Sequence, residues 1–143
     1  FIAYGKQDRQ AGEFVTAVSI PRQTDTLKCY KISKRFDQDI SALCGCFNIK
    51  IKDGIVTSAR ISFGGMAAIP KRASGVEAAL LGQDWTDATI RAAIPAFDKD
   101  FQPIDDMRAS ASYRKLTARN LLLRYFAESQ LGQSHTRVLE VAP

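Results

Sequence analysis

The sequence predicts an α+β domain, in which a three- to four-stranded antiparallel sheet carries three helices packed on one face. Two observations predict this class. Residues 13–63 contain segments that alternate apolar and polar side chains, the period of a half-buried strand. Residues 71–129 instead place apolar residues at helical spacing, between capping residues and glycine or proline stops. Strands followed by helices are typical of helices that cover one face of an antiparallel sheet.

Two strands and a loop are expected first. The stretch "EFVTAVSIP", residues 13–21, alternates and is rich in β-forming residues, so we expect a strand that ends at Pro21. The stretch "TLKCYKIS", residues 26–33, alternates as well and predicts a second strand. The stretch "KRFDQDIS", residues 34–41, is charged and has no clean period, which predicts a loop.

Residues 43–63 predict a β-hairpin, because odd-numbered positions are apolar on both sides of Asp53-Gly54. A two-residue loop would pair odd with even positions and place the two apolar sets on opposite faces. A three-residue loop with Gly54 in the left-handed region pairs Ile51 with Ile55 and keeps the sets together. We therefore predict the three-residue loop, with a buried face made of Phe47, Ile49, Ala59 and Ile61.

Two helices should follow the hairpin. Pro70 suits a first helical turn, which predicts a helix over residues 71–82. Thr86 can cap a second helix over residues 87–97. Pro95 lies inside this second helix and predicts a kink or a break there.

The last helix is expected over residues 111–129. Ser110 can cap its start, and Gly132 lies just past its end. Helical spacing predicts an apolar stripe and, apart from it, a polar face made of Arg114, Lys115 and Arg119. The stripe consists of Tyr113, Leu116, Leu121, Leu123 and Phe126.

Composition indicates one ordinary globular domain over residues 1–143, with a lead-in at 1–11 and a tail at 129–143. The chain has 143 residues, 45% of them hydrophobic and 24% charged. No apolar run approaches the roughly 20 residues that span a bilayer, so no membrane is expected. The first residues contain neither an initiator Met nor a signal-peptide pattern, which predicts a chain that starts inside a longer protein.

Net charge and cysteine count bear on the possible partners, the cellular compartment and metal binding. The net charge of +5 permits an anionic partner, but a merely solvated surface is the preferred interpretation. Three cysteines, an odd count, argue against a disulfide framework and predict a reducing, cytoplasmic compartment. The C-x-C of Cys44 and Cys46 offers too few ligands for a metal, and the single histidine, His135, is far away in the sequence.

Few positions suggest chemistry on their own. Gly64-Gly65 fits a phosphate-binding turn or a strand exit, and the lack of a dinucleotide or Walker pattern favours the exit. Lys71 and Arg72 stand at an expected helix start, where cations are disfavoured. They indicate a nearby acidic or phosphate group or, by preference, a solvated pair. Asp37 and Asp39 are either turn formers, the preferred interpretation, or residues that line a site.

Four strings, in this order, resemble a known family: "GEFVTAVSIP", "CYKISKRFDQDIS", "FGGMAAIPKRA" followed by "EAALLGQ", and "DMRASASYR". They resemble the C-terminal domain of the FAD-binding part of molybdenum hydroxylases. The likeness is greatest to the small subunit of bacterial xanthine dehydrogenase and smaller to the carbon monoxide dehydrogenase flavoprotein. It covers residues 12–128 and implies the fold described above.

The resemblance implies part of an oxidoreductase that acts on purines, with the isolated domain inactive. In such enzymes a molybdenum cofactor hydroxylates the substrate, two [2Fe–2S] clusters relay electrons, and FAD passes them to NAD or oxygen. The implied partners are upstream FAD-binding and iron–sulfur domains and a large subunit that binds the molybdenum cofactor, with no nucleic acid.

The resemblance also implies two cofactor-binding residues, and no catalytic or metal-binding one. Lys31, in the "YK" pair, matches a lysine that reaches the flavin ring, where a cation stabilises the reduced, negatively charged form. Val15, or Thr16 if the alignment shifts by one, matches an aliphatic residue near the ring. The loop over residues 32–39 would border the nicotinamide side, and Gln38 there replaces one of two adjacent acids.

Two rival classes stay open beside this one. The net charge and the basic last helix suggest a stand-alone module that binds nucleic acid or another polyanion. The lack of evident aromatic platforms argues against single-strand binding. A docking module between subunits is compatible with the flavoprotein interpretation.

Overall fold

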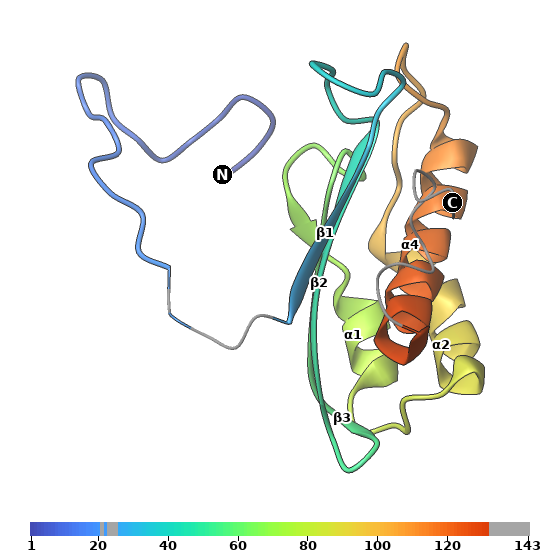
Figure 1. The fold of residues 1–143 in the computed structure, drawn as a ribbon. Helices are drawn as coiled ribbons and strands as arrows, with labels where there is room; N and C mark the ends of the chain where they lie inside the picture. The colour runs from blue at the N-terminus through green and yellow to red at the C-terminus, as the bar shows by residue number, and fades with distance from the viewer. Residues whose placement is uncertain (21, 23–25, 132–143) are drawn as a thin grey trace, which may run out of the picture.

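The computed structural model describes residues 1–20, 22 and 26–131. Its strands β1–β4 form one antiparallel sheet in the order β1-β2-β3-β4. Its helices α1–α4 cover one face of this sheet (Figure 1), so the predicted α+β class is confirmed. The elements are β1 (Leu27–Ile32), β2 (Leu43–Lys52), β3 (Ile55–Gly64), β4 (Lys71–Arg72), α1 (Ser74–Leu80), α2 (Asp87–Ala93), the 3-10 turn η1 (Ile94–Ala96), α3 (Phe97–Asp100) and α4 (Ala111–Leu131).

The sheet has one packed face and one uncovered face. On the packed face Phe47, Ile61 and Phe63 are fully buried. The Phe63 ring meets the rings of Phe97 and Phe101 edge-on, at centroid distances of 5.7 and 5.5 Å. Because neighbouring strand residues face opposite sides, the alternate positions form the uncovered face, called the open face below. Its residues include Cys29, Lys31, Cys44, Cys46 and Ser62.

The hairpin between β2 and β3 has a two-residue loop, so the predicted three-residue loop is wrong. Lys52 pairs with Ile55, and Ile51 pairs with Val56 rather than with Ile55. Asp53 and Gly54 have φ values of 52° and 80°. Two successive positive φ values define the type I′ turn that suits two-residue hairpins, and Asp tolerates this region better than most residues.

A register shift beside Ile51 reconciles this short loop with the apolar pattern. It places Phe47 opposite Ile61 and Ile49 opposite Ala59, so the predicted buried face is confirmed. Beyond the shift Val56 turns inward instead. Its backbone N–H donates to Gln83 O at 2.9 Å, and its carbonyl accepts from Gly82 N at 2.9 Å. The hairpin tip is therefore held by the turn after α1.

The predicted strand over residues 13–21 is not formed in the described part of that range. Residues 13–20 have no strand pairing and lie apart from the sheet (Figure 1). Phe14, Val18 and Ile20 are 75%, 78% and 81% exposed. The residues are β-forming, but a strand also needs a neighbour to pair with. Pro21 lies outside the described residues, whereas the predicted second strand is confirmed as β1.

The first predicted helix starts later than expected. Lys71 and Arg72 pair with β3 as the short strand β4, and α1 begins at Ser74. The Arg72 guanidinium donates twice to Glu77, at 2.6 Å for each bond. The cations therefore do not stand in a helical first turn. Both are exposed, as the preferred interpretation of a solvated pair predicts, but Arg72 also has an acidic partner, Glu77.

The predicted helix signals at three other positions are confirmed. The Thr86 hydroxyl accepts from Thr89 N at 3.3 Å, and the Ser110 hydroxyl accepts from Tyr113 N at 3.1 Å. Pro95 breaks the second helix into α2, η1 and α3. The last helix runs to Leu131, past the expected start of the tail at residue 129. Gly132 and His135 lie outside the described residues.

The predicted polar face of the last helix is wrong at Arg114, which is only 4% exposed. Tyr113 and Leu116, assigned to the apolar stripe, are 48% and 55% exposed. Helical spacing alone predicts that charged residues face solvent. A charged side chain is nevertheless tolerated in the interior where it pairs with an opposite charge. The buried residues of α4 are Arg114, Ala118, Leu121, Leu122, Tyr125 and Glu128.

The Gly64-Gly65 pair ends β3, which confirms the strand-exit interpretation, and it supplies a matched test. Gly65 has a φ of 78°, and an added Cβ would lie 2.5 Å from the Ala42 carbonyl oxygen. An added Cβ at Gly64 meets nothing within 4 Å.

We expect Gly65→Ala to lower the free energy of unfolding by more than the roughly 1–2 kcal/mol of left-handed strain. Gly64→Ala should change it by less than about 0.5 kcal/mol. Urea unfolding decides, and equal midpoints for the two variants would contradict the assignment.

Candidate functional site

The side chain of Tyr30 links the edge strand β1 to α4. Its hydroxyl donates to Glu128 Oε2 at 2.7 Å, and Arg124 Nε donates to Glu128 Oε1 at 2.9 Å. The Arg124 guanidinium also lies over the Tyr30 ring, 4.7 Å from its centroid. Burial and the Glu128 carboxylate raise the pKa of Tyr30, so the phenol stays a hydrogen-bond donor at neutral pH. Because Tyr30 points inward, its neighbour Lys31 points outward.

Lys31 therefore lies on the open face, near the end of β1. It is exposed and pairs across the sheet with Cys44. Its ammonium has no hydrogen-bond or ion-pair partner among the described residues. A cation held on a fixed strand, without an acidic neighbour, is available to a negative or electron-rich ligand.

The loop over residues 33–41 follows Lys31 and is held by its own acids. Asp39 accepts the backbone N–H of Arg35 at 2.9 Å and that of Ile40 at 3.0 Å. The Arg35 N–H contributes most to lowering the pKa of Asp39. Asp37 Oδ1 accepts the N–H of Gln38, whose φ is 48°. The interpretation of Asp37 and Asp39 as turn formers is confirmed.

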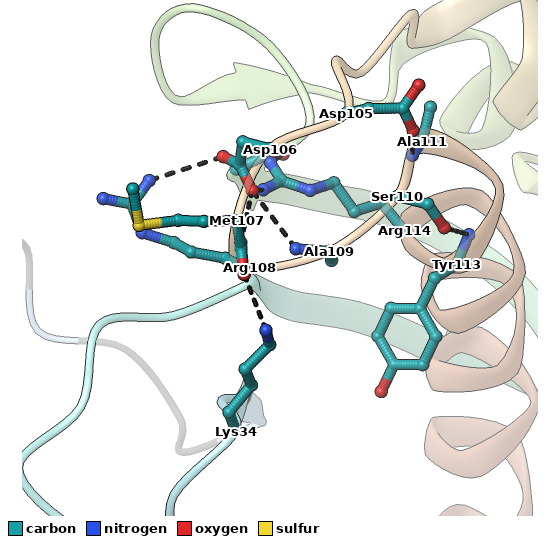
Figure 2. A network of polar contacts seen from close by, with 11 residues as sticks. Lys34, Asp105, Asp106, Met107, Arg108, Ala109, Ser110, Ala111, Tyr113 and Arg114 are labelled. Carbon is teal, nitrogen blue, oxygen red and sulfur yellow. Dashed lines mark hydrogen bonds and ion pairs between the residues drawn. The ribbon is translucent and has the colours of Figure 1, made fainter.

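A buried guanidinium, that of Arg114, joins the end of β3 to the loop before α4. Its Nη1 donates to the Gly65 carbonyl and its Nη2 to Asp106 Oδ1, each at 2.6 Å. The same carboxylate oxygen accepts the backbone N–H groups of Arg108 and Ala109 at 2.8 and 3.1 Å (Figure 2). Asp106 therefore both shapes the loop over residues 105–110 and pairs with the buried guanidinium of Arg114.

A cleft of about 490 Å³ opens between the loop after β1 and the loop before α4. Lys34 reaches from the first loop to the second, where its Nζ donates to the Met107 carbonyl at 2.6 Å (Figure 2). Arg108 lines the cleft from the other side, and its Nε has no hydrogen-bond partner among the described residues. The cleft therefore carries two cations and the carboxylate of Asp106, which pairs with Arg108 at 3.4 Å.

The structure does not bring the two sequence-predicted site residues together. Val15 is 69% exposed in the segment that lies apart from the sheet, and so is not near Lys31 on β1 (Figure 1). Thr16, the alternative to Val15, lies in the same segment. Of the predicted set, Lys31 and the loop over residues 32–39 share one end of the domain.

Sequence reasoning missed the residues that position this site: Arg114, Asp106, Glu128 and Arg124. One signal was present. Arg124 and Glu128 stand at i and i+4, the spacing of a helical ion pair. Arg114 and Glu128 also fall in register with Ala118, Leu121 and Tyr125, which marks a buried helix face. A charge in register with such a stripe indicates a partner on another element.

The described residues contain no helix that is both long and apolar enough to cross a membrane. Within residues 1–20, 22 and 26–131, no group of three or more His, Cys, Asp or Glu side chains is arranged to hold a metal ion.

The described residues form a single four-stranded sheet whose one face is packed by helices. The family model of the CO dehydrogenase flavoprotein C-terminal domain matches residues 28–129. The chain belongs to this family, as the resemblance of its motifs predicted.

Several curated proteins are similar to the chain. Nicotinate hydroxylase hnxS of Emericella nidulans is 28% identical over an alignment 143 positions long, which covers 92% of the chain and 11% of that protein. Xanthine dehydrogenase of the same organism is 31% identical over 118 residues, which cover 78% of the chain and 9% of that protein. The chain thus spans about a tenth of these relatives.

Two solved structures share the fold. Carbon monoxide dehydrogenase from Hydrogenophaga pseudoflava, in a form that lacks the Mo-pyranopterin moiety of its cofactor, matches with a TM-score of 0.66 and 25% identity. The match covers 73% of this chain and 37% of that one. Quinoline 2-oxidoreductase from Pseudomonas putida 86 matches with a TM-score of 0.67 and 18% identity, over 79% and 39% of the two chains. The latter supports the fold alone.

Asp106 gives the site a testable pH dependence. The Arg108 and Ala109 N–H groups and the Arg114 guanidinium lower the pKa of Asp106 from 3.8 to about 2. A depressed carboxyl pKa stabilises the folded state above the unfolded value and ceases to do so as pH falls through the folded one. We expect Asp106→Asn to lower the melting temperature at neutral pH, and the difference from wild type to shrink between pH about 4 and 2.

The control is Asp8→Asn, because Asp8 lies in the exposed lead-in segment. The melting temperature of this variant should equal that of wild type at every pH of the series. A constant difference between wild type and Asp106→Asn from neutral pH to pH about 2 would show that the charge of Asp106 does not stabilise the loop.

Proposed function

We propose that this chain forms one wall of the flavin site in a molybdenum hydroxylase of the xanthine dehydrogenase type. The observation that carries the proposal is the exposed ammonium of Lys31, which has no partner among the described residues and lies on the open face because its neighbour Tyr30 is anchored inward. Membership of a flavoprotein C-terminal domain family supplies the identity of the ligand. Several of the similar proteins are named xanthine dehydrogenases, which supports the class of parent enzyme.

The residues present fit a flat ring. The open face around Lys31 carries small side chains, among them Cys29, Cys44 and Ser62, so a planar group can approach the sheet. FAD, when bound, accepts electrons and passes them to an acceptor. The Lys31 ammonium places positive charge at the ring edge and favours the reduced, negatively charged form. Val15 would pack near the ring once its segment is held.

The remainder of the flavin site must come from elsewhere in the parent protein. Residues 13–20 expose a row of apolar side chains that this domain does not cover. They would pack against an upstream FAD-binding domain, which binds most of the cofactor. Iron–sulfur domains and a large subunit with the molybdenum cofactor would supply electrons from a hydroxylated purine, and this domain alone would be inactive.

The acceptor side would lie at the end of the sheet. The loop over residues 32–39 and the cleft beside it, lined by Lys34 and Arg108, would border the nicotinamide side. NAD or oxygen would take the electrons there, in the cytoplasm.

The rival function, a stand-alone polyanion-binding module, has less support. It was motivated by the basic residues of the last helix, and these are paired with acids. Arg114 pairs with Asp106, and Arg124 pairs with Glu128. Lys115 and Arg119 both pair with Asp98. Cations that already pair with a carboxylate are less available to bind a phosphate backbone.

The test is Lys31→Met in the full-length parent enzyme, which keeps much of the side-chain bulk and removes the charge. The reduced flavin should lose about 1–3 kcal/mol of stabilisation, the range for a charge-assisted hydrogen bond. For a two-electron couple this lowers the midpoint potential by roughly 20–65 mV. Spectroelectrochemistry of the flavin measures it. Hydroxylation with an artificial acceptor that bypasses the flavin should persist.

The matched control is Lys28→Met, on the same strand but on the packed face, where Lys28 pairs with Phe47. Its flavin potential should equal that of wild type. If Lys31→Met also left the potential and NAD reduction unchanged, Lys31 would be an ordinary surface lysine and the proposal would fail.

A further inference from the structure

The three cysteines of the chain gather on the open face. Cys29 of β1 lies directly opposite Cys46 of β2, and Cys44 follows two residues away on the same face of β2. All three thiols are free. Cys29 is exposed, and the other two are half-buried. The described cysteines do not form a metal-binding group, so a different chemistry has to account for any role of this cluster.

Strand geometry separates the possible pairs. Residues directly opposite in an antiparallel pair have Cα atoms about 4.5–5.5 Å apart, within the roughly 4.4–6.8 Å that a disulfide spans. This is the relation of Cys29 to Cys46. Diagonal residues such as Cys29 and Cys44 are about 7–8 Å apart. Cys44 and Cys46, two residues apart along one strand, are separated by about 6.6 Å, with side chains that project in parallel.

The environments of the two facing thiols differ. Burial, followed by the neighbouring thiols of Cys29 and Cys44, raises the pKa of Cys46 to about 12. Cys46 therefore stays protonated at neutral pH and is a poor first nucleophile. Cys29 is exposed to solvent and lies two residues from the Lys31 ammonium, on the same face. An exposed thiol in an electropositive setting is the usual site of first oxidation.

We propose that Cys29 and Cys46 form a reversible dithiol–disulfide site that reacts with peroxides, with Cys29 as the thiol that is oxidised first and Cys46 as the resolving thiol. The Cys29 thiolate attacks one oxygen of hydrogen peroxide and breaks the O–O bond. This yields the Cys29 sulfenic acid, and the leaving hydroxide takes a proton to become water. The Cys46 sulfur then attacks the Cys29 sulfur and displaces hydroxide, which leaves as a second water with the Cys46 proton. Two thiols are oxidised by two electrons and one peroxide is reduced to two waters, and an external dithiol reverses the step.

The evidence for this site does not depend on a bound flavin, because it consists of the strand register, the exposure of Cys29 and the burial of Cys46. The disulfide would also join the edge strand β1 covalently to β2, beside Lys31. A covalent bond at this point would fix the strand that otherwise depends on its hydrogen-bond ladder and on Tyr30.

The test oxidises the full 143-residue chain with hydrogen peroxide, alkylates the remaining thiols and maps the products by mass spectrometry. The expected product has lost two hydrogen atoms, retains one alkylatable thiol and recovers all three on reduction. Trypsin separates Cys29, in residues 29–31, from Cys44 and Cys46, both in residues 36–50. The two peptides should be linked, and fragmentation at Gly45 should place the bond on Cys46.

Two variants serve as controls. Cys44→Ser should form the cross-link with the same yield as wild type. Cys46→Ala should lose it, and Cys29 should proceed to the sulfinic acid, which a dithiol does not reverse. Circular dichroism confirms that each variant folds. The disulfide mapping of the wild-type chain tests the proposal even if a variant does not fold. A link between Cys44 and Cys46, dimers joined between chains, or three thiols that remain alkylatable after oxidation would each overturn the proposal.

Discussion

The buried guanidinium of Arg114 is the contact on which the functional end of the domain depends. One nitrogen donates to the Gly65 carbonyl at the end of β3, and another donates to Asp106 in the loop before α4. A buried cation is stabilised by a paired acid and by hydrogen bonds, and two other segments supply these to Arg114, so this contact links three parts of the chain. The left-handed turn at Gly65 is part of this assembly, since a side chain there would collide with the Ala42 backbone. The cleft lined by Lys34 and Arg108 lies over the loop that this contact shapes.

The two faces of the sheet have different roles in the domain. The packed face supplies the core through Phe47, Phe63 and their aromatic neighbours. The open face has no such cover, and its character is set by which side chains the strand alternation sends outward. Tyr30 decides this for β1, because its hydrogen bond to Glu128 holds it inward and leaves Lys31 outside. The chain belongs to the family of the CO dehydrogenase flavoprotein C-terminal domain, and the proposed flavin contact rests on Lys31, one of the exposed cations of this face.

Much of the fold follows from local sequence, because the signals at Thr86, Pro95 and Ser110 act within one or two turns of chain. The errors arise where distant contacts decide. The Asp53-Gly54 loop is two residues long because a register shift farther along the hairpin restores the apolar pattern, and periodicity does not reveal a bulge. Residues 13–20 have the composition of a strand without a partner in this domain. Helical spacing predicts that Arg114 faces solvent, because its partner Asp106 lies in another segment and leaves no mark on the helix pattern. The family motifs pointed to Lys31, but the side chains that hold it in place could be found only from the structure.

The central claim is that the open face beside Lys31 borders a bound flavin. Amine-reactive labelling of the full-length parent enzyme, with FAD bound and after its removal, tests this claim most directly when peptide mass spectrometry reads each lysine. The account predicts that FAD protects Lys31 from labelling, while Lys50 and Lys52 at the far end of the hairpin react equally in both states. Equal labelling of Lys31 with and without FAD would contradict it.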